Sequence, residues 1–291
     1  MVSGGRNIYQ DCLGRNMHLS KHSVVKNEKY LISLQLIEKK LKGRVVLEMN
    51  GANGIDESWV RQNLGRKIKE SSETIWDANS KKVVKRTKEL WKNLVFSVSE
   101  TEEVSIQEKS KAYSKAFIRG DFKLKNWNAQ VEKFLNRQAF LSKNFIHLGI
   151  REMDIDTKKL FLEQLFQDAG SWKEIKNTEV YKPLLNCYSQ EEIALINEAA
   201  PEFFDLGMGK RPYNLDYGSP NEVVLRAVLQ DLYDIPNHPN IVFGEYPLIV
   251  EILAPNRRPV QRTTNLISFW EGSYINVRKD LMGRYPKHEW R

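Results

Sequence analysis

Short runs that are rich in apolar and β-branched residues, often alternating with polar ones, fill the first hundred residues, as is typical of β-strands. Strands are expected at residues 30–37, 44–49, 73–76, 81–90 and 94–98. The segment 77–80 is expected to close a hairpin, 51–54 to form a turn, and 56–64 to form a short helix capped by Asp56. This pattern favours a small barrel of the OB type over residues 1–100.

Apolar positions change to helical spacing after residue 103. Two helical faces are expected, one formed by Val131, Phe134, Leu135, Gln138 and Leu141 and the other by Leu160, Leu162, Leu165 and Phe166. Asp156 is the expected cap of the second helix. Residues 101–200 are therefore predicted to be a helical segment.

In the last third of the chain, the apolar residues follow strand spacing in some segments and helical spacing in others. A helix is expected at 221–232, strands at 246–253 and 260–263, and a final helix at 265–282. One stripe of that final helix should be buried, namely Leu266, Trp270, Tyr274, Val277 and Leu281. Residues 201–291 are predicted to be a mixed α/β domain, and the whole chain belongs to the α+β class.

The net charge of +8 is unevenly distributed along the 291 residues. Residues 1–100 hold 19 basic and 11 acidic residues, whereas residues 101–200 and 201–291 are each neutral. Within the last segment, residues 251–291 carry an excess of four positive charges. Local basic excess fits a polyanionic partner such as nucleic acid, and solvated basic surface without a partner is the alternative.

Neither a membrane span nor a disulfide framework is predicted. No run of about 18 apolar residues occurs, and Cys12 and Cys187 stand far apart in the sequence. We therefore expect a cytoplasmic protein with reduced thiols.

Motifs that would indicate catalysis are missing from the sequence. The segment 207–210 lacks the upstream glycine and the following Ser or Thr of a phosphate-binding loop. His18 and His22 have no third ligand at metal-site spacing, and the paired carboxylates at 154/156 and 191/192 fit helix starts better than acid–base chemistry. No catalytic residue, metal site or bound cofactor is predicted.

Basic residues interleaved with aromatic ones are the remaining candidates for function. Lys81, Lys82, Lys85, Arg86 and Lys88 crowd the predicted hairpin, and Trp76 and Trp91 flank it. Such a set can hold a nucleic-acid backbone and stack a base, although lysines also protect an exposed edge strand from aggregation. A second basic set lies near the C-terminus and comprises Arg257, Arg258, Arg278, Lys279, Arg284 and Lys287.

The closing residues 258–290 resemble the signature of HrpB-type DEAH-box ATP-dependent RNA helicases. They contain R-P-V-Q-R-T, F-W-E-G-S-Y-I-N-V-R-K and G-R-Y-P-K-H-E-W in order. Weaker similarity covers Ser3–Arg6, which resembles the stretch after the family's motor and makes Arg6 a further candidate for nucleic-acid binding, and the hairpin 76–84. The family's RecA-like lobes, with their ATP and magnesium sites, have no counterpart in this sequence, so a fragment or a split gene is implied.

The resemblance implies an accessory region that holds single-stranded RNA or another nucleic acid for a helicase motor, joined in cis or in trans. By itself the chain is expected not to be an enzyme. The alternative is a structural or protein-interaction module that docks on the motor or another partner, with Trp270 and the aromatic residues near the C-terminus as anchors.

Overall fold

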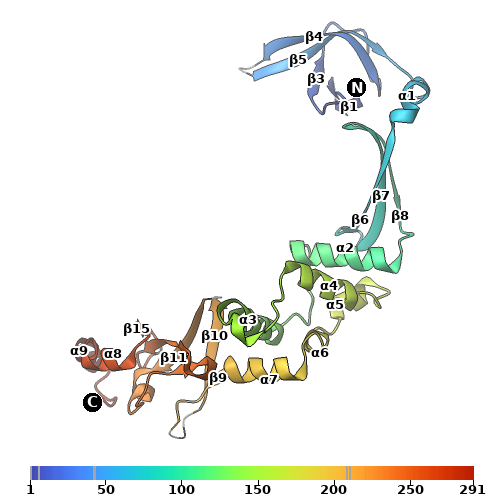
Figure 1. The fold of residues 1–291 in the computed structure, drawn as a ribbon. Helices are drawn as coiled ribbons and strands as arrows, with labels where there is room; N and C mark the ends of the chain where they lie inside the picture. Colours follow the sequence, from blue (N-terminus) through green and yellow to red (C-terminus); the bar gives the residue numbers. More distant parts are fainter. Residues whose placement is uncertain (1, 6, 42–43, 208, 210, 220) are drawn as a thin grey trace. The chain divides into compact units, whose positions relative to one another are not determined.

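The computed structural model describes residues 2–5, 7–41, 44–207, 209, 211–219 and 221–291 (Figure 1). The chain divides into two compact units, residues 1–121 and 122–291. Among the helices in these ranges, none is long and apolar enough to span a membrane.

Unit 1 begins with a five-stranded sheet in the order β1-β2-β3-β5-β4. Its strands are β1 (Val2–Gly5), β2 (Ile8–Gln10), β3 (Asn16–Leu19), β4 (Leu31–Leu41) and β5 (Arg44–Gly54). β4 and β5 are antiparallel, whereas β3 runs parallel to β5. Tyr9, Met17, Leu31 and Met49 bury their side chains in one core.

A second, three-stranded sheet follows in the order β6-β7-β8. Helix α1 precedes this sheet in the sequence and helix α2 follows it. The elements are α1 (Glu57–Leu64), a 3-10 turn (Gly65–Lys67), β6 (Lys69–Asp77), β7 (Lys82–Trp91), β8 (Leu94–Thr101) and α2 (Ile106–Arg119). Tyr30, Val60 and Phe96 form a separate small core. The Asp77 carboxylate closes the hairpin by accepting bonds from the Asn79 and Ser80 amides.

The α+β class is confirmed, and so are the strands and the hairpin expected in residues 1–100. The described strands form two open sheets, however, and not the closed barrel that we expected. The turn expected at 51–54 is also wrong. These residues continue β5 opposite β4, and Gly51 supplies the left-handed φ of 59° that this stretch of strand requires.

Unit 2 begins with a helical layer, as the periodicity predicts. Its helices are α3 (Ala129–Asn144), α4 (Ile155–Leu165), α5 (Trp172–Asn177), α6 (Tyr181–Leu185) and α7 (Gln190–Ala199), with a 3-10 turn at Ile146–Leu148. The cap of α4 is Asp154, which accepts a bond from the Thr157 amide, and not Asp156 as expected. Ser189 and Glu192 form a capping box at α7. In the carboxylate pair at 191/192, Glu192 therefore has a structural role.

A five-stranded sheet in the order β15-β14-β11-β10-β9 completes unit 2. Its strands are β9 (Phe203–Phe204), β10 (Tyr213–Ser219), β11 (Glu222–Val228), β14 (Ile249–Leu253) and β15 (Pro259–Thr263). The remaining elements are β12 (Asn240–Ile241), β13 (Tyr246–Pro247), two 3-10 turns (Leu229–Leu232 and Val242–Gly244), α8 (Leu266–Glu271) and α9 (Tyr274–Arg284).

Two expectations for this part of the chain are wrong. The segment 221–232 is strand β11 and a 3-10 turn, because Val223, Val224 and Leu225 are buried in a central strand between antiparallel β10 and parallel β14. The final helix is two helices, which separate at Gly272 and Ser273. Of the expected apolar stripe, Leu266, Tyr274 and Leu281 are buried, whereas Trp270 and Val277 are half-buried.

Candidate nucleic-acid interface

The basic residues of the β6–β7 hairpin are engaged in ion pairs. On β7, Lys82 contacts Glu102 at 2.7 Å, Arg86 contacts Glu100 at 2.7 Å, and Lys88 contacts Glu73 at 3.2 Å. Alternate residues of a strand face opposite sides, so these three cations share one face of the sheet. This pairing neutralises much of the positive charge of β7. Its net contribution to stability is small, because the three acidic partners are exposed.

The opposite face of this sheet carries helix α2. Lys85 points to this side and lies 3.9 Å from Glu108 of α2. Trp76 packs its ring against Tyr113 with centroids 5.3 Å apart and is only 7% exposed, so it is a core residue and not a stacking platform. The predicted hairpin set is therefore divided between two faces. Lys81, in the turn, is exposed.

Helix α2 carries a second set of cations, which lies beside a groove between this helix and β6. Lys111, Lys115 and Arg119 are four residues apart and so lie on one face of the helix. They line a cavity of about 430 Å³ whose other wall includes Ser72 and Thr74 of β6. All three cations are exposed. In the described part of the chain neither lysine has an ion pair, whereas Arg119 contacts Asp121 at 2.7 Å.

Acidic residues also reach this groove. Glu73 and Glu108 line it, and each contacts a lysine of β7. Glu108 is further held by Ser105, whose hydroxyl and amide donate to its carboxylate and lower its pKa. Both acids are therefore already compensated, which leaves Lys111 and Lys115 of α2 as the lysines of the groove without an ion pair to a described residue.

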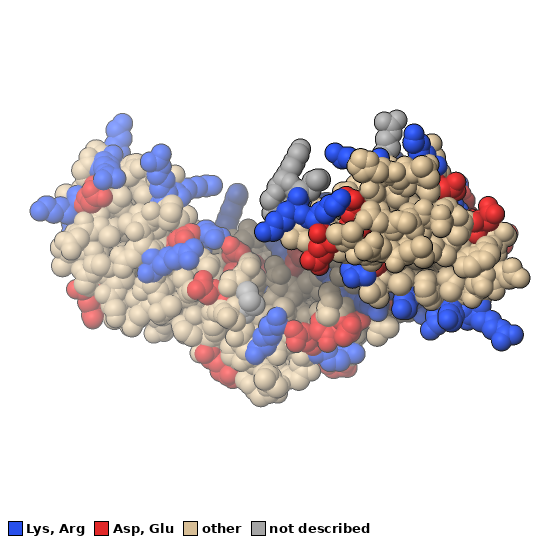
Figure 2. Space-filling model, turned by 90° about the horizontal axis from the view of Figure 1, so that it is seen from above, with Lys and Arg blue, Asp and Glu red and all other residues tan. Residues whose placement is uncertain are grey.

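The net charge of the chain lies entirely in unit 1. Residues 1–121 contain 23 basic and 15 acidic residues, which is an excess of eight, and residues 122–291 contain 22 of each. Basic and acidic side chains are interspersed on the face drawn in Figure 2 and do not form a single basic field. On this face basic side chains are therefore separated by acidic ones.

The C-terminal candidates are exposed but do not gather into one site. Arg257 and Arg258 lie in the turn before β15, and Arg278 and Lys279 lie on α9. None of these four forms an ion pair with a described residue, and neither does Lys287, whereas Arg284 contacts Asp280 at 3.1 Å. Arg6 lies outside the described residues. The structure thus divides the hairpin cations into two groups, and those near the C-terminus come from the turn before β15, from α9 and from the residues after it.

Trp270 belongs to an aromatic cluster in unit 2. Its ring centroid lies 4.8 Å from that of Phe269, 4.9 Å from Tyr274 and 5.6 Å from Tyr233. The Tyr233 and Tyr274 hydroxyls are hydrogen bonded at 2.9 Å. Core packing is confirmed for Tyr274, which is buried, whereas Trp270 packs within the cluster but is only half-buried.

Comparisons with known proteins agree with the signature at the end of the chain. Residues 161–291 match the family model HrpB_C, described as ATP-dependent helicase C-terminal. These residues are therefore similar to the C-terminal region of HrpB-type helicases. Over 169 residues the chain is also 27% identical to the ATP-dependent RNA helicase HrpB of Escherichia coli K12, a match that covers 57% of this chain and 21% of that protein.

The fold comparison extends the HrpB likeness over the whole chain. A crystal structure of the E. coli DExH-box NTPase HrpB superposes with a TM-score of 0.61 at 23% identity, and one of the DEAH/RHA helicase HrpB with 0.55 at 21%. The two superpositions cover 100% and 99% of this chain and 36% of each crystallised chain. The chain therefore spans about a third of the length of these HrpB structures and corresponds to a C-terminal portion.

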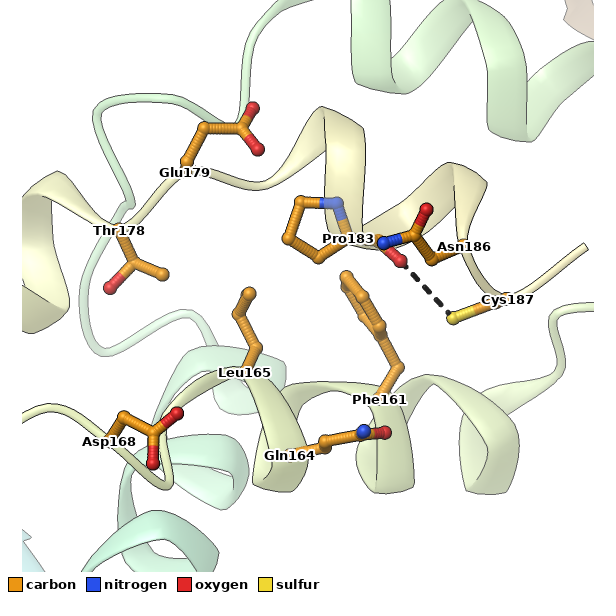
Figure 3. Close-up of a pocket in the computed structure, with 9 residues that line it drawn as sticks. All are labelled: Phe161, Gln164, Leu165, Asp168, Thr178, Glu179, Pro183, Asn186 and Cys187. Carbon is orange, nitrogen blue, oxygen red and sulfur yellow. Dashed lines mark hydrogen bonds between the residues drawn. The ribbon is translucent and has the colours of Figure 1, made fainter.

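A pocket inside the HrpB-type region has a different character from the groove on α2. Figure 3 shows it between α4 and α6, with Phe161 and Leu165 on one wall and Pro183 on the other. Its volume is about 420 Å³. Asp168 and Glu179 give it negative charge, so it is unsuited to phosphate. Burial raises the pKa of the Cys187 thiol in its wall, and that thiol donates to the Pro183 carbonyl at 3.5 Å, so Cys187 is not an activated nucleophile.

Sequence reasoning missed the row on α2, although its signal was present. The i, i+4, i+8 spacing of Lys111, Lys115 and Arg119 is visible in the sequence, but the neutral charge of residues 101–200 concealed it. No cluster of three or more His, Cys, Asp or Glu side chains suited to a metal ion occurs within the described ranges.

Proposed function

We propose that this chain is an accessory single-stranded RNA-binding region of an HrpB-type ATP-dependent helicase. The observation that carries the proposal is the row of cations on α2, which lies in the unit that holds all of the net positive charge. The named HrpB relatives, an RNA helicase and an NTPase, support the choice of RNA as the polyanion.

The groove on α2 suits a nucleic-acid backbone. Residues four apart on a helix lie about 6 Å apart, a spacing similar to that of successive phosphates in an extended single strand. Lysines can follow such a backbone without reading its sequence. The hydroxyls of Ser72 and Thr74 on the facing wall add neutral donors.

Fluorescence anisotropy with a labelled single-stranded RNA tests the proposal. We expect binding at low salt that weakens as salt rises, because cations on the protein release counterions from the phosphates. The double variant K111E/K115E should lower the affinity for every sequence and reduce the slope of log affinity against log salt by about 1.4, at about 0.7 per lost phosphate contact.

A matched control lies on α5. Lys173 and Lys176 are exposed and form no ion pair with a described residue, so K173E/K176E changes the net charge by the same amount in unit 2, at residues that do not line the groove. If both double variants reduce binding equally, overall charge and not the groove accounts for it. Binding that is absent at low salt would refute the function itself.

A second candidate is the docking module. Ile275 is 67% exposed and Met282 is 44% exposed, on the side of α9 that also carries Lys279. Such apolar side chains fit a protein contact better than RNA. A pull-down with a helicase motor segment tests it, and I275E/M282E should abolish capture while leaving RNA affinity unchanged.

A further inference from the structure

An apolar cavity of about 240 Å³ opens in unit 1 between α1 and the end of the β7–β8 hairpin. Tyr30, Val60 and Phe96 are among its lining residues and are 2%, 4% and 5% exposed. The Tyr30 and Phe96 ring centroids are 5.7 Å apart at a tilt of 38°. These residues belong to a small hydrophobic core, so the cavity is a fixed feature of the fold.

Two tryptophans also line this cavity. Trp59 on α1 is 48% exposed, and Trp91 at the end of β7 is half-buried. The Lys92 ammonium lies 5.6 Å from the centre of the Trp91 ring. A large aromatic side chain left half in water beside an apolar cavity offers a flat face to a planar guest, and base–aromatic stacking uses such a face.

Cations without an ion pair follow directly after the last residue of α1 that lines the cavity. Leu64 lines the cavity, and the 3-10 turn that follows it brings Arg66 and Lys67, with Lys69 two residues later. These three side chains are exposed and form no ion pair with any described residue. The guest should therefore carry negative charge next to its planar apolar part.

Lys29 and Arg61, which also lie close to this cavity, have acidic partners already. Lys29 and Arg61 contact Glu57 at 2.7 and 2.9 Å, and Lys29 followed by Arg61 lowers the pKa of Glu57 to about 2. Arg61 also contacts Glu89 at 2.8 Å. These pairs brace α1 against β7 and leave charge recognition to the cations that follow Leu64.

We propose that this cavity receives a nucleobase of a bound single strand, which stacks on Trp59 while an adjoining phosphate contacts Arg66 or Lys67. The inference rests on the proposed function and assigns it a base-binding site separate from the groove on α2. An apolar side chain of a protein would fill the cavity but would leave these cations unmatched.

The test compares single-stranded RNA with an abasic ribose-phosphate strand of equal length, using anisotropy on the 291-residue chain. Wild type should bind the RNA more tightly than the abasic strand. W59A should weaken RNA binding about 5-fold or more, as loss of one stacked base does, and leave the abasic strand unaffected. W59F should keep most of the affinity, because it retains an aromatic face.

Controls separate this site from the rest of the protein. Phe243 in unit 2 is 58% exposed, against 48% for Trp59, so F243A removes a similarly exposed aromatic side chain that does not line the cavity and should change neither affinity. Circular dichroism of W59A, whose side chain is half exposed, checks that it folds. If W59A binds both strands like wild type while K111E/K115E weakens both, the base site is refuted and the proposed function stands. If wild type binds neither strand, both proposals fail.

Discussion

Arg137 of α3 is the most demanding electrostatic feature of unit 2, and replacing it by methionine tests how much it stabilises that unit. The residue is 2% exposed, and burial lowers the pKa of its guanidinium. Its nitrogens donate to the Ala200 carbonyl at 2.5 Å, to the Asn197 side chain at 2.7 Å and to the Glu202 carboxylate at 3.0 Å. Through them α3 is tied to the end of α7 and the start of β9.

The expected cost follows from what R137M leaves behind. Methionine fills most of the space, so the packing loss is small. Removing one partner of a buried charged network costs about 3 to 5 kcal/mol. Glu202 is 31% exposed and regains water, which places the loss of unfolding free energy near the lower end, at about 3 kcal/mol.

Urea denaturation followed by circular dichroism measures this loss, and hydrogen exchange assigns it to unit 2. The control is K133M, one helical turn earlier on α3, where the lysine is exposed and lies 5.9 Å from the Phe203 ring. It should cost less than about 1 kcal/mol. A loss below about 1 kcal/mol for R137M, or one equal to that of K133M, would refute the assigned role.

Three further predictions concern charge and backbone geometry. Hydrogen bonds from Arg262 and Arg226 lower the pKa of Glu251 in the folded protein. The two ion pairs therefore contribute their full stabilisation at pH values above 4.5, the ordinary glutamate pKa, and this stabilisation is lost as the pH falls through the lower pKa of the folded state. E251Q should cost about 1 to 2 kcal/mol at pH 7, and its difference from wild type in urea denaturation should vanish in acid; a constant difference would contradict this. K82E/R86E should weaken RNA binding uniformly but less than K111E/K115E in the same anisotropy assay, because both residues already contact carboxylates; a larger effect would return the main contact to the hairpin. G51A should lower the thermal stability by about 1 kcal/mol, because an alanine at φ 59° is strained, and an unchanged melting temperature would show that β5 relaxes there.

Features set by neighbouring residues were predictable from the sequence. The β6–β7 hairpin is predictable because its turn is closed by the side chain of Asp77 within four residues. The helices between residues 103 and 200 are predictable because their apolar spacing is regular. The strand within 221–232 is not, since Val223 and Val224 fit either a helical or a strand periodicity and only pairing with β14, more than twenty residues later, selects the strand.

The candidate site was predictable only at the level of the unit. Counting charges located the basic excess in the first hundred residues, and the structure places all of it in unit 1. Which cations are compensated depends on the register of β7 against β8, which sets Arg86 opposite Glu100. No local pattern fixes that register, because it follows from how the two strands are packed.

The strand order of the unit 2 sheet has a consequence for synthesis on the ribosome. β14 lies between β11 and β15, and its Val250 and Ile252 are fully buried, but β15 is the last strand of this sheet to be made. Until residues 259–263 leave the exit tunnel, β14 is an unprotected apolar edge. A nascent chain stalled in this interval should be more prone to aggregate and to recruit chaperones than one stalled after β15.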